Sequence, residues 1–189
     1  MCKQCQLNPV YEFTNQRKLC KMCFIKWFEK KFLYIVRKFN MFNMEDRVGY
    51  SGDGSFREVV LESLLKMFAE RRSLKLIKLP SGKKTDRIAL ATTADLEAYK
   101  ISEELIKGEV KNLKQISPVE KTGGKITIKP LYLFLDKEVL IYAKLKKLKF
   151  KEKKSEAGEN KFSELIDNLE KKHPEIKHAI INYFLELRK

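Results

Sequence analysis

Residues 2–39 read CKQCQLNPVYEFTNQRKLCKMCFIKWFEKKFLYIVRKF and contain every cysteine of the 189-residue chain. The cysteines form two C-x2-C pairs, separated by fourteen residues, at Cys2, Cys5, Cys20 and Cys23. A two-residue gap lets a tight turn aim both sulfurs at one ion, and two such pairs are typical of a tetrahedral Zn²⁺ knuckle. We therefore predict that these four thiolates bind a structural zinc ion.

Three alternatives stay open for the same cysteines: two disulfides, four buried thiols that bind nothing, and an iron–sulfur cluster. Disulfides are not expected, because the cysteines begin at residue 2 with no signal peptide before them, and an oxidising compartment is therefore not indicated. An iron–sulfur cluster uses the same four ligands and ranks below zinc as an interpretation.

Apolar residues after the second cysteine pair recur at spacings of four, four, three and four, which predicts an amphipathic helix over about 22–39. They are Phe24, Phe28, Phe32, Ile35 and Phe39. Lys26, Lys30 and Arg37 fall on the opposite side of this helix. Their place beside the knuckle makes them the first candidates for phosphate contacts, although a solvated helix face is the plainer interpretation.

Positive charge is concentrated in two segments of the chain, whose formal net charge is +15. Residues 1–39 carry nine Lys or Arg against two Glu (+7), and residues 144–154 carry seven Lys against one Glu (+6). This concentration indicates a polyanion partner, for which nucleic acid is the first candidate. Lys144, Lys147 and Lys151 are further candidate contacts. A membrane partner is not expected, because neither segment shows a free lipid-facing stripe and no apolar run reaches a membrane span.

Strand and helix patterns alternate through the middle of the chain, which predicts an α/β fold with a parallel, Rossmann-like sheet and ligands at the carboxyl ends of the strands. The expected strands cover 47–50, 74–79, 87–92 and 125–128, and the expected helices cover about 55–71, 94–107, 136–147, 161–171 and 175–187. We divide the chain into a knuckle with its basic helix (1–40), an α/β domain (41–150) and a helical extension (151–189). Within the extension, residues 151–160 are expected to form a charged loop.

A small-residue turn follows the first expected strand and consists of Ser51, Gly52, Asp53, Gly54 and Ser55. Strand, small-residue turn and helix is an arrangement whose backbone N–H groups bind phosphate. The plainer interpretation is a turn that needs glycine for its geometry, with the last serine as a helix N-cap. The aspartate places a negative charge where a phosphate loop would prefer a lysine.

These motifs together resemble the tRNA 2-thiolation proteins of the PP-loop ATP pyrophosphatase superfamily. The likeness begins with the two cysteine pairs, Trp27-Phe28, the basic helix and a strand that ends at Ser51-Gly52. It continues downstream in 91–96 (ATTADL), 128–131 (IKPL), 137–139 (KEV) and 142–143 (YA). The resemblance places Thr92 and Thr93 in the second segment of a nucleotide site.

Departures from the family pattern suggest that the nucleotide loop is vestigial. Active members of the family carry Ser-Gly-Gly-Lys-Asp-Ser, whereas residues 51–56 here read SGDGSF, without the lysine and with Asp53 inside the loop. An uncompensated carboxylate beside a triphosphate costs about 1 kcal/mol or more. Active members also use further cysteines near the nucleotide, and none is left here once the knuckle is filled.

The resemblance therefore implies a non-catalytic, tRNA-binding accessory protein in tRNA 2-thiouridine synthesis, closest to the type of cytoplasmic tRNA 2-thiolation protein 2. It favours RNA over DNA, a cytoplasmic location, and a heteromer with an active PP-loop thiolase or a homodimer as the assembly. Zinc is the expected cofactor, and ATP is a doubtful one. The alternatives are an ATP-dependent tRNA 2-thiolase with a divergent phosphate loop, and a zinc-ribbon nucleic-acid-binding adaptor.

Overall fold

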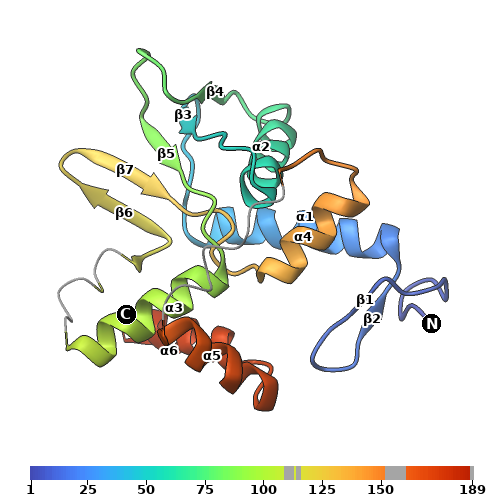
Figure 1. Cartoon of the computed structure of the whole chain (residues 1–189). Helices are drawn as coiled ribbons and strands as arrows, with labels where there is room; N and C mark the ends of the chain where they lie inside the picture. Colours follow the sequence, from blue (N-terminus) through green and yellow to red (C-terminus); the bar gives the residue numbers. More distant parts are fainter. Residues whose placement is uncertain (109–112, 114–115, 152–160, 188–189) are drawn as a thin grey trace.

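The protein contains a five-stranded, mostly parallel sheet, beside which α1 (Lys21–Lys38), α2 (Phe56–Ala69) and α4 (Asp136–Leu145) lie in Figure 1. The computed structural model describes residues 1–108, 113, 116–151 and 161–187. In spatial order the strands are β4 (Lys75–Lys78), β3 (Arg47–Tyr50), β5 (Arg87–Ala89), β7 (Lys125–Ile128) and β6 (Val119–Thr122). The predicted α/β fold is confirmed. The charged segment expected to form a loop lies outside the described residues, except for Lys151.

The edge strand β6 was not expected from the sequence. It pairs antiparallel with β7, whereas the other neighbours in the sheet are parallel. Gly123 and Gly124 join the two strands with φ angles of 56° and 76°, and two successive positive φ angles are what a tight hairpin turn requires. The segment VEKT has no alternating apolar pattern, so its pairing with β7 is the main sign that it is a strand.

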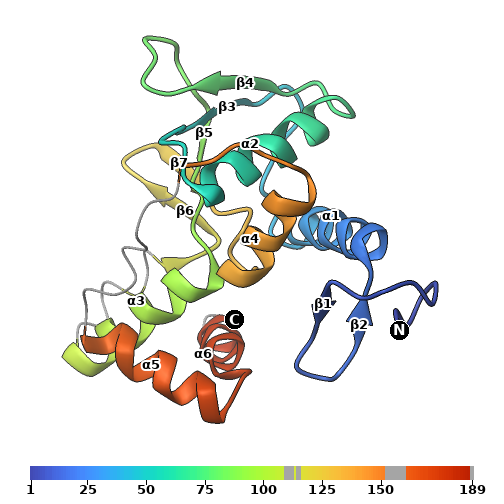
Figure 2. The same ribbon diagram turned by 45° about the vertical axis from the view of Figure 1, so that its right-hand side comes forward.

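The helices form two groups: Figure 2 shows α1, α2 and α4 beside the sheet, and α3 (Ala94–Lys107), α5 (Lys161–Lys172) and α6 (Ile176–Glu186) together below it. Helices α1, α2 and α4 share the main core with the sheet, while α3 and α6 contribute to a second core. A small hairpin of β1 (Tyr11–Glu12) and β2 (Lys18–Leu19) precedes α1.

Helix α1 belongs to the main core through its aromatic face. Phe28 is fully buried, and its ring centroid lies 4.2 Å from those of Phe134 and Tyr142. The helical spacing of the apolar residues therefore predicted this face correctly, because the periodicity of a helix is local. The division of the chain at residues 40 and 150 stays a prediction.

The connection from β4 to β5 is short and passes close to β3. Residues 79–86 make this crossover without a helix. A β-carbon on Gly49, in β3, would lie 3.0 Å from a side-chain carbon of Thr85 and 3.1 Å from one of Leu79. Glycine at this position therefore lets the crossover lie directly on the strand. Within the described part of the chain, no helix combines the length and the apolarity needed to cross a membrane.

Candidate metal centre and nucleic-acid interface

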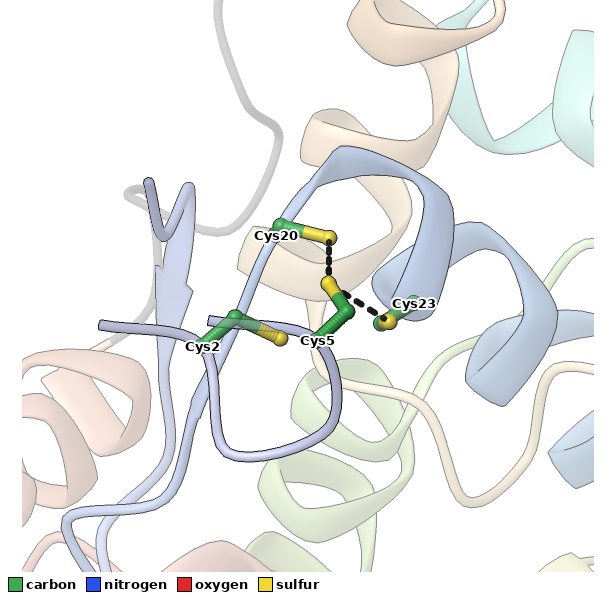
Figure 3. A group of neighbouring side chains, drawn as sticks. All are labelled: Cys2, Cys5, Cys20 and Cys23. Atoms are coloured by element: carbon green, nitrogen blue, oxygen red, sulfur yellow. Dashed lines mark hydrogen bonds between the residues drawn. The ribbon is translucent and has the colours of Figure 1, made fainter. Parts of the chain in front are cut away.

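The four cysteines come together at the start of α1 (Figure 3). Cys2 and Cys5 lie in the first turn of the chain, Cys20 is the N-cap residue of α1, and Cys23 lies in the first turn of that helix. The backbone N–H of Lys3 donates to the carbonyl of Lys18, at 3.0 Å. This bond holds the first cysteine pair against the β1–β2 hairpin and opposite the second pair.

The sulfur positions suit a single metal ion. All four Sγ atoms lie within 4.8 Å of one another, with Cys5 to Cys20 at 3.3 Å and Cys5 to Cys23 at 3.6 Å. Zn–S bonds of about 2.3 Å in a tetrahedron place neighbouring sulfurs about 3.8 Å apart. The observed distances are also far longer than the roughly 2.05 Å of a disulfide bond, and all four thiols are free. The donor set therefore fits a metal.

Aromatic side chains fix the cysteine hairpin to α1. The ring centroid of Tyr11 lies 5.0 Å from that of Phe24, and the ring of Phe13 meets Trp27 edge-on at 4.7 Å. The guanidinium of Arg17 lies 4.1 Å above the ring of Phe13. Edge-on pairs and cation–π contacts of this kind stabilise a small unit that has little core of its own.

The turn after β3 is organised as a helix cap. The carboxylate of Asp53 accepts a hydrogen bond from the backbone N–H of Ser55 at 2.8 Å, and the hydroxyl of Ser55 accepts one from the N–H of Glu58 at 3.3 Å. These contacts match the plainer interpretation, in which Ser55 is the N-cap of α2. Ser51, Gly52 and Asp53 are exposed, and Gly54 has a φ of 85°.

Two lysines from other elements lie against this turn. A β-carbon on Gly52 would lie 2.4 Å from Cε and 2.9 Å from Nζ of Lys78, at the end of β4. The backbone N–H of Lys151 donates to the carbonyl of Gly54 at 2.8 Å. The sequence analysis named Lys151 as a candidate phosphate contact but did not name Lys78. Lys78 reaches the turn only because the parallel register of β3 and β4 pairs it with Tyr50.

Thr92 and Thr93, which the resemblance assigns to a nucleotide site, lie at the same end of the sheet as the turn after β3. Thr93 is fully buried, and its hydroxyl donates to Oδ1 of Asp136 at 2.7 Å. Nε of Arg57, in the first turn of α2, donates to the same oxygen at 2.7 Å. Thr92 is half-buried. The carboxylate of Asp136 thus links the first turn of α2 to the start of α3, and its bond to Thr93 occupies the hydroxyl of that residue.

A buried ammonium group connects this region to the C-terminal helices. Nζ of Lys177 lies 2.7 Å from Asp95, 2.8 Å from Asp167 and 2.6 Å from Glu170, while the residue is only 4% exposed. Burial disfavours its charge, but the carboxylates, Asp95 first, outweigh burial and raise the pKa of Lys177. Burial and then the charge of Asp136 raise the pKa of Asp95, against the effect of Lys177. No sequence motif marked this cluster.

The candidate phosphate contacts are all at the surface. Lys26, Lys30 and Arg37 are exposed on α1, and the second set is exposed at and beyond the end of α4. The members of the second set are Lys144, Lys147 and Lys151. The two helices that carry most of these residues pack together, since Glu29 of α1 accepts a hydrogen bond from Tyr142 of α4 at 3.0 Å and pairs with Lys146 at 3.5 Å. RNA binding by these residues stays a prediction.

Comparison with known proteins identifies the fold. The structure is similar to a U34-tRNA thiolase, NcsA from Methanococcus maripaludis, which was solved with its [4Fe-4S] cluster. The TM-score is 0.74 and the sequence identity is 19%, over 98% of this chain and 86% of that chain. No protein-family model and no curated protein matches the sequence. The likeness shows a shared thiolase fold over nearly the whole chain.

Proposed function

We propose that this protein is a non-catalytic, tRNA-binding accessory protein in tRNA 2-thiouridine synthesis, which acts in the cytoplasm with an active PP-loop thiolase. The observation that carries the tRNA assignment is the fold, which this chain shares with a U34-tRNA thiolase across 98% of its length. The exposed basic residues of α1, and those at the C-terminal end of α4, supply positive charge that would attract a polyanion such as tRNA.

The non-catalytic role rests on what the chain offers around the turn after β3. Asp53 occupies the position of the family's lysine-bearing loop, and its carboxylate caps the backbone of Ser55. Every cysteine lies in the N-terminal cluster, so no thiolate remains to carry sulfur once a metal is bound there. A partner with a complete site would then supply the chemistry, and a homodimer is the alternative assembly.

We assign Zn²⁺ to the cysteine cluster. Each cysteine of a [4Fe–4S] cluster binds a different iron, so its sulfurs stand farther apart than those around one ion. The short separations among Cys5, Cys20 and Cys23 therefore support a mononuclear site. When bound, zinc would supply only structural cross-linking at this closed four-cysteine site. One zinc per chain, without visible absorption, is the expected composition of the purified protein.

Lys78 favours the runner-up function, an ATP-dependent thiolase with a divergent loop. Its ammonium group lies against Gly52 and would partly replace the missing loop lysine. Isothermal titration with ATP and Mg²⁺ separates the two functions, and we expect no binding heat. Micromolar binding that Lys78→Ala abolishes, while Lys75→Ala at the exposed start of β4 preserves it, would replace the accessory role with the enzyme.

Alanine at both Lys26 and Lys30 is expected to weaken binding to unmodified tRNA about tenfold at about 0.1 M salt. Both side chains are exposed, so the fold should be unchanged. Loss of two phosphate contacts should also flatten the slope of log K against log[salt] by about 2. Fluorescence anisotropy over a series of salt concentrations measures both effects.

The matched control removes the same charge from the β6–β7 hairpin, with Lys121→Ala and Lys125→Ala. An equal loss of affinity in this control would show that α1 makes no specific contribution. Equal affinity of the wild-type protein for tRNA and for random duplex DNA at matched salt would instead favour the general zinc-ribbon adaptor.

A further inference from the structure

A pocket of about 590 Å³ opens at the opposite end of the sheet from the turn after β3. It lies between the last turns of α1 and α2 and is bordered by the segment that leads into β3. Its lining includes Asn40 and Met44, before β3, and Leu74, before β4. The Ser51–Ser55 turn follows the carboxyl end of β3, so the pocket is separate from the vestigial nucleotide loop.

Three exposed arginines line the pocket: Arg37, Arg71 and Arg72. Among the described residues, no carboxylate lines it. The arginines complement the C-terminal ends of α1 and α2, which carry about half a negative charge each. That leaves an excess of about two positive charges. Guanidinium groups of this kind bind phosphate oxygens in a bidentate manner.

The pocket lining also contains apolar and aromatic side chains. The rings of Phe42 and Phe68 lie 5.2 Å apart between centroids, and both residues are half-buried in the pocket lining. Leu33 and Leu74 add further apolar surface to the lining. An unpaired base offers a flat π-face that stacks on such a surface irrespective of sequence. The basic and the aromatic side chains of the lining match the two parts of a nucleotide, its phosphate and its base.

The segment that borders the pocket is held in place by buried contacts. Asn40 ends α1 with a φ of 49°, and the backbone N–H of the fully buried Met41 donates to the carbonyl of Val36 at 3.0 Å. This Schellman arrangement fixes the exit of the chain from the helix. Farther on, the carboxylate of Asp46 accepts a hydrogen bond from the N–H of Asn43 at 2.6 Å. These contacts hold the border of the pocket in place.

We infer that this arginine pocket binds one unstacked nucleotide of single-stranded RNA. The inference rests on the RNA-binding part of the proposed function and adds a specific site to it. Lys26, Lys30, Leu33 and Arg37 are spaced by four, three and four residues, so they lie along one side of α1. The helix thus carries cations from the cysteine cluster to the pocket, over a total length of about 27 Å for its 18 residues.

Methyl NMR of the full-length protein labelled with ¹³C at the methionine methyl groups tests this site directly. Met44 lines the pocket and is 81% exposed, whereas Met22, 58% exposed at the start of α1, serves as an internal reference. Titration with uridine 5′-monophosphate is expected to shift Met44 saturably and to leave Met22 unchanged. Arg71→Ala with Arg72→Ala should weaken this binding about tenfold, while the Lys121→Ala and Lys125→Ala control should keep it within about twofold.

Three outcomes would overturn the inference: an unchanged Met44, equal shifts at Met44 and Met22, or the same response to inorganic phosphate as to the nucleotide. A parallel titration with tRNA separates this failure from that of the proposed function. Binding of tRNA with an unchanged Met44 signal would contradict nucleotide binding in the pocket and would agree with the proposed function. A response of Met44 to the nucleotide without any binding of tRNA would contradict the proposed function and would agree with nucleotide binding in the pocket.

Discussion

Cys20→Ser is expected to lower the metal content from about one ion per chain to less than about one-tenth. Cys20 supplies one of only four thiolates, and the apparent binding free energy of a structural zinc, about 10–16 kcal/mol in zinc-finger peptides, depends on the complete set. The main sheet should stay folded, because the stacking of Phe28 on Tyr142 lies within the main core. Elemental analysis and limited proteolysis measure the two effects.

Met22→Ser is the matched control for this variant, since Met22 is exposed and stands between the second pair of cysteines. It should retain a full complement of metal and an uncleaved N-terminus. Zinc retained by the Cys20 variant would contradict the four-cysteine site. Iron with visible absorption in the wild-type protein would contradict the assignment of zinc.

Lys177→Met is expected to lower the free energy of unfolding by about 3–5 kcal/mol, because it leaves buried carboxylates without their cation. Asp95 should account for the largest share of this loss of stability, because its side chain is only 11% exposed, whereas that of Asp167 is 47% exposed. Urea denaturation gives the difference. Lys171→Met, on the exposed side of α5, is the control and should change stability by less than about 0.5 kcal/mol. Equal effects of the two variants would contradict the role of the buried cluster.

The stability deficit of the Lys177 variant should also narrow as the pH falls from neutral into the acidic range. The pKa of Asp95 in the folded protein is already raised above its unfolded value, and loss of Lys177 raises it further. The penalty for the buried charge is therefore present above the folded pKa and is relieved as the pH falls through it. The Lys171 control should show no comparable narrowing. A deficit independent of pH would show that packing, and not charge, is responsible.

The features that the sequence predicted well are local ones. The cysteine cluster and the buried face of α1 follow from spacings of two to four residues, and both were found as expected. The third expected strand, 87–92, stops at Ala89, although the N–H of Leu90 still donates to the carbonyl of Ile128 at 2.9 Å. Strand β6 depends on pairing with β7, which no pattern within VEKT revealed.

The parts of the candidate sites that were missed depend on distant contacts. Lys78 reaches Gly52 through strand register, and Lys177 meets Asp95 across 82 positions of the chain. Arg37 was a candidate from its place beside the knuckle, whereas Arg71 joins it only because α1 and α2 end at the same pocket. Residue spacing along a single helix or strand does not predict any of these contacts.

The most direct test of the accessory role is to purify a tagged copy of the protein from its native cells at moderate salt. Mass spectrometry then identifies the bound proteins, and sequencing identifies the bound RNA. We predict that a PP-loop homologue with an intact Ser-Gly-Gly-Lys-Asp-Ser loop is recovered together with tRNA. Recovery of neither would contradict the proposed function.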